Sequence, residues 1–226
     1  FQYIGDSAFD TCRSLVTFSI PSNSTLVSIG NDAFKDCARL ENITLPSSLK
    51  DPVPGGSSNS TSLGERTFYG CTNLKEITIP KNVTTIPKNC FYGCTQLVTV
   101  NLPTNFKEIG EGGFKGCSAL SSIDLPDGMN EISNYAFQNC TLLSEVKIPK
   151  NLMVVMTSSF QGCSNLRKVT FQTGILKDIA DKAFQDCSKL ESVVIPKGVT
   201  NIGNGSFKNC SALKTVSIPG TVATIG

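Results

Sequence analysis

The side chains with the widest chemical repertoire in this sequence are its ten cysteines. Thiolates act as nucleophiles and as ligands for zinc and iron–sulfur clusters, and two thiols can form a disulfide. Nine of the cysteines stand third after a phenylalanine, in the motif Phe-x-x-Cys, and successive copies lie 23 to 34 residues apart. Metal sites use closer pairs such as Cys-x-x-Cys, and the nearest approach here is Cys90 and Cys94. We therefore expect no metal centre.

Other residue types that support catalysis are missing or lack partners. The sequence has no histidine, which removes the usual general base, the common catalytic triads and the commonest metal ligand. A cysteine nucleophile needs an exposed site with an activating cation or base, whereas these cysteines share a register with apolar residues. The pairs Gly55-Gly56 and Gly112-Gly113 lack the neighbours of a phosphate-binding loop. We expect a protein that is not an enzyme and binds no cofactor.

The charge balance argues against two further classes of partner. The chain has 20 basic and 18 acidic residues, a net charge of +2, and only 17% charged residues. No strong field would attract nucleic acid or anionic lipid. No apolar run approaches the ~18 residues of a membrane span. We expect neither nucleic-acid binding nor membrane insertion by this segment.

The Phe-x-x-Cys motif marks an internal repeat. The copies are Phe9/Cys12, Phe34/Cys37, Phe68/Cys71, Phe91/Cys94, Phe114/Cys117, Phe137/Cys140, Phe160/Cys163, Phe184/Cys187 and Phe207/Cys210. From Cys71 onward the step is 23 or 24 residues, and a fixed period of this size is typical of a solenoid. We predict one domain over residues 1–226 with about nine repeats. The sequence begins and ends in mid-repeat without polar caps, so we expect it to be a segment of a longer array.

One repeat is interrupted by an insertion. The step from Cys37 to Cys71 is 34 residues, and residues 50–62 are rich in proline, glycine and serine. That composition is typical of a surface loop. Asn59 in this loop begins one of seven Asn-x-Ser/Thr sequences, and it is the glycosylation site we expect if the chain enters a eukaryotic secretory route.

Each repeat predicts the same order of elements. Apolar residues follow each cysteine at +3, +6 and +8, as in Leu97, Val100 and Leu102, and the last two alternate with polar residues as in a half-buried strand. A proline then ends the strand because it has no amide hydrogen, and only Gln172 breaks this rule. A second apolar wall follows. The spacing of three between Phe, Cys and the next Leu then fits a short helical or 3₁₀ turn.

The register of the cysteines predicts buried, reduced thiols. A free thiol packs as a small hydrophobe with a weak hydrogen-bond donor. Cys90 occupies a position where other repeats have alanine, such as Ala33 and Ala136. Stacked strands lie ~5 Å apart, which does not exclude disulfides, but a ladder of nine leaves one thiol over. The cysteine content therefore does not indicate a compartment.

The repeat resembles the BspA-like leucine-rich repeats, also called the Treponema pallidum type. The shared pattern is Leu-x-x-Val-x-Ile-Pro-x-x-Val-x-x-Ile-Gly-x-x-Ala-Phe-x-x-Cys, and it covers nearly all of residues 1–226. The resemblance implies a right-handed, curved solenoid with a parallel sheet on its concave face. It also implies a surface or secreted protein of mucosal bacteria, or of protozoa such as Trichomonas and Entamoeba, that adheres to host matrix proteins or to other microbes. The family offers no catalytic residues to transfer.

With the core residues assigned to packing, function is expected on the polar side of the predicted sheet. Concave faces of solenoids are frequent binding surfaces, although any solvated sheet face must also be polar. The candidate binding residues there are Thr99, Asn101, Ser122, Asp124, Glu145, Lys147, Arg167, Lys168 and Thr170. Lys147, Arg167 and Lys168 form a slightly basic cluster, which Glu145 offsets.

We expect a cell-surface or secreted module that binds a protein, such as a host matrix protein, or a glycan through the concave sheet or the inserted loop. Two alternatives remain open on the sequence. The segment could be a spacer that displays another domain, or an intracellular interaction module compatible with reduced thiols.

Overall fold

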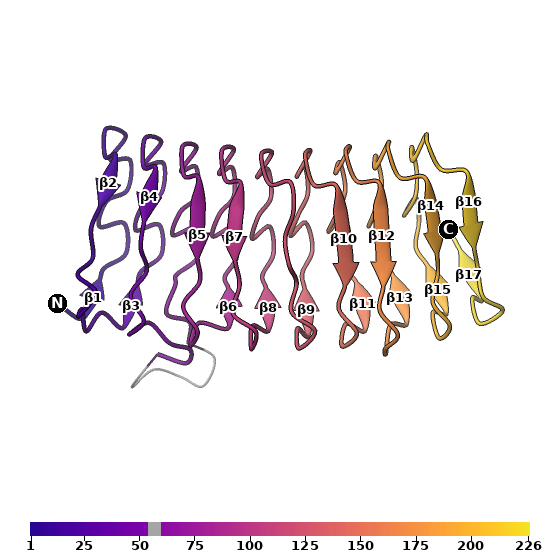
Figure 1. The fold of residues 1–226 in the computed structure, drawn as a ribbon, viewed down its shortest axis with the longest axis horizontal. Coiled ribbons are helices and arrows are strands. Elements are labelled where there is room, and N and C mark those ends of the chain that lie inside the picture. The colour runs from indigo at the N-terminus through magenta and orange to yellow at the C-terminus, as the bar shows by residue number, and fades with distance from the viewer. Residues whose placement is uncertain (54–59) are drawn as a thin grey trace.

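The computed structural model describes residues 1–53 and 60–226 as a parallel β-solenoid. Each repeat forms one coil, and the coils stack in a nearly straight row with the two termini at opposite ends (Figure 1). A single repeat is too small to bury its own apolar face, so each coil depends on its neighbours for a core.

One side of the solenoid carries every described strand of three or four residues, together with two shorter ones, and we call it the strand face. It comprises β2 (Thr17–Phe18), β4 (Asn42–Ile43), β5 (Glu76–Thr78), β7 (Thr99–Asn101), β10 (Glu145–Ile148), β12 (Lys168–Phe171), β14 (Ser192–Val194) and β16 (Thr215–Ser217). These strands pair in parallel as β2-β4, β5-β7 and β10-β12-β14-β16. In β7 the central Val100 is buried and both neighbours are exposed, which confirms the predicted two-residue period.

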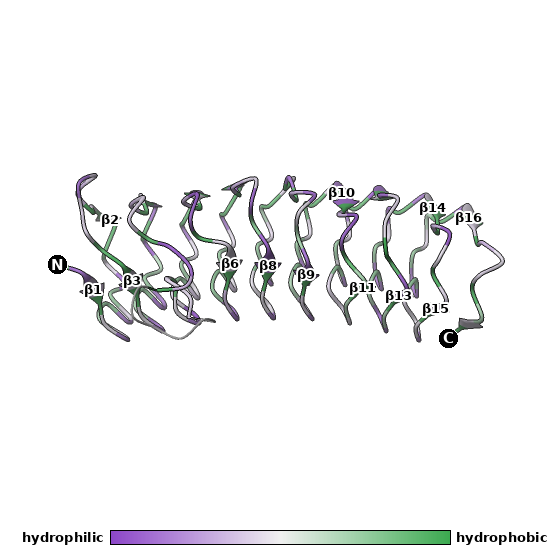
Figure 2. Cartoon of the chain, turned by 90° about the horizontal axis from the view of Figure 1, so that it is seen from below, coloured by the Kyte–Doolittle hydropathy of each residue, from purple (hydrophilic) through white to green (hydrophobic). Residues whose placement is uncertain are grey.

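A second set of short strands forms the opposite wall, which sequence patterning had predicted only as an apolar wall. It comprises β1 (Tyr3–Ile4), β3 (Ser28–Ile29), β6 (Thr85–Ile86), β8 (Glu108–Ile109), β9 (Glu131–Ile132), β11 (Val154–Val155), β13 (Asp178–Ile179), β15 (Asn201–Ile202) and β17 (Thr224–Ile225). They pair in parallel as β1-β3, β6-β8-β9 and β11-β13-β15-β17. Figure 2 shows hydrophobic and hydrophilic stretches recurring in each coil.

A column of phenylalanine rings runs through the core between the two walls. The rings of Phe9, Phe34, Phe68, Phe91, Phe114, Phe137, Phe160, Phe184 and Phe207 stack with centroids 5.1–5.6 Å apart and planes within 11° of parallel. This spacing is close to the ~4.8 Å between hydrogen-bonded strands. Ring stacking and backbone pairing are therefore satisfied by the same separation of coils.

The predicted helical turn around each Phe-x-x-Cys motif is wrong: the described residues contain no helix. Around Phe114, successive backbone amides alternate between acceptors in their own coil and acceptors in the next coil. The amides of Lys115 and Cys117 close tight turns within the coil at 3.0 and 3.1 Å, whereas those of Phe114 and Gly116 donate to the next coil at 2.8 Å. A helix would need all four amides bonded within its own coil. Half of these amides donate to carbonyls of the next coil instead, so the segment forms a series of tight turns.

Two residues in each such segment have a positive φ, which separates the successive turns. They flank the phenylalanine, as Gly112 (62°) and Gly116 (76°) do around Phe114. Other coils use Asn139 (62°) or Lys182 (58°) at these positions. Glycine and asparagine enter this region at low cost, which explains their frequency beside the motif.

The cysteines bond the coils together without disulfides. All ten are free, and all but Cys12 are buried. Eight thiols donate to the carbonyl oxygen of the phenylalanine one coil earlier at 3.1–3.3 Å, for example Cys117 to Phe91. Burial raises the pKa of Cys37 to about 11 and raises that of Cys117 well above its usual range. The thiols are neutral donors that follow the period of the array.

We expect only Cys12 to react quickly with a maleimide reagent in the folded protein at neutral pH. The other nine thiols are buried and protonated, and the thiolate is the reactive species. Mass spectrometry of the labelled protein should show one adduct, and labelling in denaturant should give ten. Rapid labelling of two or more thiols under native conditions would contradict the buried ladder.

Candidate functional site

The nine candidate residues chosen from the sequence are all exposed to solvent. Thr99 and Asn101 lie on β7, Glu145 and Lys147 on β10, and Lys168 and Thr170 on β12, with Arg167 directly before β12. On adjacent strands Glu145 pairs in register with Lys168, and Lys147 with Thr170. Four of the candidates are thus neighbours on one small area of sheet.

Ser122 and Asp124 are exposed but do not lie on a strand, which corrects the expectation of one strand per repeat. Residues 121–126 form no ladder, so β7 and β10 are not joined in one sheet. Their coil keeps the apolar alternation, with Leu120 and Leu125 buried. Burial fixes which side chains point inward, whereas a ladder also needs matched amides and carbonyls on the adjacent coil. The strand face is therefore interrupted.

The predicted basic cluster is only partly neutralised. Lys147 lies 3.8 Å from the Asp127 carboxylate. Within residues 1–53 and 60–226, no carboxylate forms an ion pair with Arg167 or Lys168. Glu145 neighbours Lys168 in strand register without bonding to it. Positive charge thus remains available at the start of β12.

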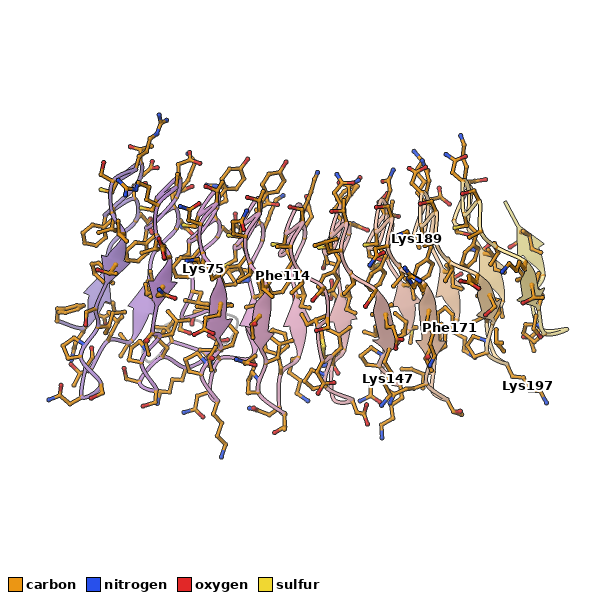
Figure 3. All side chains as sticks on the ribbon, turned by 45° about the horizontal axis from the view of Figure 1, so that its top comes forward. Lys75, Phe114, Lys147, Phe171, Lys189 and Lys197 are labelled. Carbon is orange, nitrogen blue, oxygen red and sulfur yellow. The ribbon has the colours of Figure 1, made fainter. Side chains whose placement is uncertain are left out.

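A groove of about 500 Å³ beside β12 and β14 was not foreseen as a site. Its lining includes Lys168, Thr170, Phe171, Gly174, Val194 and Lys197. The sequence carried a signal for it, because Gln172 replaces the strand-ending proline and the same repeat is one residue longer. Figure 3 shows Phe171 between Lys147 and Lys197 along one side of the array.

The inserted loop borders a second cleft, of about 690 Å³, next to β6 and β8. Asp51 and Thr61 of the loop line it together with Glu65, Glu108 and Glu111. Asn59, the predicted glycosylation site, lies outside the described residues.

Asp51 repairs the backbone ladder where the insertion interrupts it. In regular coils one carbonyl accepts two successive amides of the next coil, as the Thr84 carbonyl does from Lys107 and Glu108. Ahead of β6, the Asp51 carboxylate takes that role and accepts the amides of Thr84 (2.8 Å) and Thr85 (3.1 Å). Its other oxygen accepts the Ser62 amide and hydroxyl at 2.7 and 3.0 Å. A side chain thus stands in for a displaced main-chain carbonyl.

Glu108 in the lining of this cleft has a second glutamate beside it. Glu108 and Glu131 are paired in register on β8 and β9, and both are half-buried. The Ser133 hydroxyl donates to Glu131. Burial and the adjacent Glu131 raise the pKa of Glu108. The ionised form of Glu108 is therefore less stable here than in water.

We expect Asp51→Ala to lower the free energy of unfolding by about 2–4 kcal/mol, because it leaves several partly buried donors without acceptors. The shift of the denaturation midpoint measures the loss, and hydrogen exchange at the Thr84 and Thr85 amides should speed up. The control Asp124→Ala removes an exposed carboxylate and should change stability by less than ~0.5 kcal/mol. Equal effects of the two variants would contradict the bridging role.

We expect Glu108→Gln to stabilise the protein at pH 7 and to have no effect at pH values below the ordinary glutamate pKa. A carboxyl whose pKa is raised on folding contributes stability that is fully present at low pH and is lost as the pH rises through the folded-state pKa. Denaturant titrations at both pH values measure the difference. Glu76→Gln, at an exposed position on β5, is the matched control, and an equal gain in stability from the two variants would contradict the role of burial at Glu108.

The described residues contain no group of three or more cysteine, aspartate or glutamate side chains placed to hold a metal ion. With no helix among them, the described residues also offer none that could cross a lipid bilayer.

A family model for the BspA type leucine-rich repeat region matches residues 1–52, 61–177 and 130–226 in six copies. The crystal structure of a T. pallidum leucine-rich repeat protein aligns with a TM-score of 0.65 at 25% identity, covering 88% of this chain and 78% of that chain. A leucine-rich cell surface protein of Faecalibacterium prausnitzii aligns with a TM-score of 0.50 at 22% identity, over 97% of this chain and 83% of that chain, and shares the fold. No curated protein gives a significant match. The stacked coils and the match over most of the sequence show that this chain belongs to the BspA-type leucine-rich repeat family.

Proposed function

We propose that this chain is a non-enzymatic protein-binding module of a cell-surface or secreted protein, and that its strand face contacts a protein ligand such as a host matrix protein. The observation that carries the proposal is the exposed polar side chains on β7, β10 and β12, which packing does not explain. Membership of a leucine-rich repeat family supports a protein-interaction scaffold and suggests no enzymatic activity.

The geometry of the strand face supports a protein ligand. Parallel coils place exposed residues of successive repeats at the same height, such as Glu145, Lys168 and Ser192. An array of this kind offers many moderate contacts over a long surface, and solenoids commonly bind proteins in this way. The mixed charge of the row suits a protein surface better than a polyanion.

A bulky label on the strand face should abolish binding to immobilised matrix proteins. Such a label attaches selectively in a Cys12→Ser background, because the remaining native thiols are buried. Asn101→Cys on β7 places a polyethylene-glycol maleimide on the strand face, and Asn134→Cys places it in an exposed turn before Phe137. Binding is measured by surface plasmon resonance before and after labelling.

Loss of binding at the Asn101 position with retention at the Asn134 position is the expected result. Equal retention at both would overturn the assignment of the strand face. Failure of the unlabelled chain to bind any matrix protein would contradict the adhesive role and favour a spacer.

A further inference from the structure

The groove between β12 and β14 is where the array departs most from its own repeat. Phe171 stands at a position that other coils fill with leucine or isoleucine, and Val194 stands in an exposed row that is otherwise polar. Gln172 replaces proline, and one extra residue follows before Ile179. Phe171 and Val194 line the same groove although they come from two coils, and Gln172 directly follows Phe171 in the chain. Folding of the repeat does not require any of them.

The wall of the groove is held rigidly by the residue that replaces proline. The Gln172 amide donates to the Ile148 carbonyl at 3.2 Å, a bond that proline cannot form. Its side chain accepts the Lys150 amide at 3.0 Å and donates to Asp127 at 2.8 Å. Gly174 then passes so close to Lys150 that an added Cβ would lie 1.9 Å from the Lys150 carbonyl oxygen. The groove is therefore built before any ligand arrives.

The floor of the groove is apolar and accessible. Val194 is 67% exposed, which is unusual for an apolar side chain in this array. Both of its neighbours in the same surface row, Thr170 and Ser217, are polar. Phe171 is half-buried and meets Phe184 edge-on, with ring centroids 6.2 Å apart. An apolar side chain of a ligand would remove both residues from water and gain about 25 cal/mol per Å² of buried apolar surface.

Two lysines border this floor, and Glu145 neighbours Lys168 in strand register without bonding to it. Lys168 and Lys197 both line the groove, and neither forms an ion pair within the described part of the chain. None of the described residues that line it is acidic. Lys147, by contrast, forms an ion pair with Asp127, which lies in the coil before that of Lys147. The charge of the groove is therefore complementary to an acidic ligand.

We propose that this groove is the docking site for an extended, acidic segment of a partner protein that carries an apolar side chain between its carboxylates. The apolar residue would cover Phe171 and Val194, and the carboxylates would pair with Lys168 and Lys197. Anionic glycans lack the apolar group that the floor calls for. The bases of a single-stranded nucleic acid could stack on Phe171, so DNA is a competing ligand in the test below. The inference rests on the proposed function, because it names the chemistry of the protein partner at the strand face.

Fluorescence anisotropy of labelled pentapeptides on the whole chain tests this assignment. The probe is Glu-Asp-Leu-Asp-Glu, and the comparison peptides are Glu-Asp-Ser-Asp-Glu and Lys-Lys-Leu-Lys-Lys. A single-stranded DNA oligonucleotide serves as a polyanion whose bases can also stack on aromatic rings. We expect the leucine-containing acidic peptide to bind at least about fivefold more tightly than any comparison probe. Equal binding of the serine peptide or the DNA would overturn the proposal, as would no binding of the leucine peptide.

Matched variants locate the binding. The double variant Lys168→Glu/Lys197→Glu should raise the Kd of the leucine-containing peptide at least about tenfold. Val194→Ser should raise that Kd about fivefold. Two control variants change the equivalent positions in a distant coil: Lys81 corresponds to Lys197, and Thr78 corresponds to Val194. Lys81→Glu and Thr78→Ser should each leave the Kd of the peptide within about twofold of that of the parent chain. Unchanged denaturation midpoints verify that each variant is folded. Equal weakening by Lys81→Glu would refute a site at this groove.

The two proposals can fail separately. If the label at position 101 blocks matrix binding while the peptide does not bind, the groove assignment is wrong and the strand-face function stands. If the peptide binds as described while no matrix protein does, the groove stands and the adhesive role is wrong.

Discussion

The separation between stacked coils is the constraint on which the rest of this molecule depends. Hydrogen bonding between adjacent parallel strands requires ~4.8 Å, and phenylalanine rings in the core stack at 5.1–5.6 Å. A coil that satisfies one requirement nearly satisfies the other. Residues at equivalent positions therefore form columns through the array: rings in the core, thiols beside them and polar side chains on the strand face. Each column places the same demand on every coil, which is why the repeat tolerates little variation inside.

The same constraint explains the turns that replace the expected helices. Coils donate amides to their neighbours outside the strands as well, and around Phe114 every second amide is used in this way. The remaining amides can close only local turns, and left-handed residues such as Gly116 must separate those turns. Where an insertion removes a carbonyl from the ladder, the Asp51 carboxylate supplies the missing acceptor. The backbone demand is thus met even where the sequence pattern is broken.

Because the columns fix the interior, the freedom of this chain lies at exposed positions and at departures from the repeat. The positions of Lys168 and Thr170 carry different side chains in other coils, because packing of the core does not restrict an exposed position. Gln172 and Gly174 are different, since they form specific contacts with Lys150 that the repeat does not need for folding. Contacts of this kind, next to an accessible apolar residue, distinguish a shaped surface from a merely solvated one.

The sequence by itself determined the period and the inward residues, and it offered no residues on which to base a catalytic hypothesis. Phe114, Cys117 and Val100 recur at fixed steps, and burial at a fixed step can only mean a shared core. It also identified the exposed rows, because side-chain alternation in a strand is a local property. Only the tertiary structure decided which acceptor each backbone amide and thiol bonds to. The thiol bond from Cys117 to Phe91, the role of Asp51 and the gap in the sheet at Ser122 each depend on an atom in another coil. The groove at Phe171 and Val194 likewise arises from two coils, so neither repeat alone could reveal it.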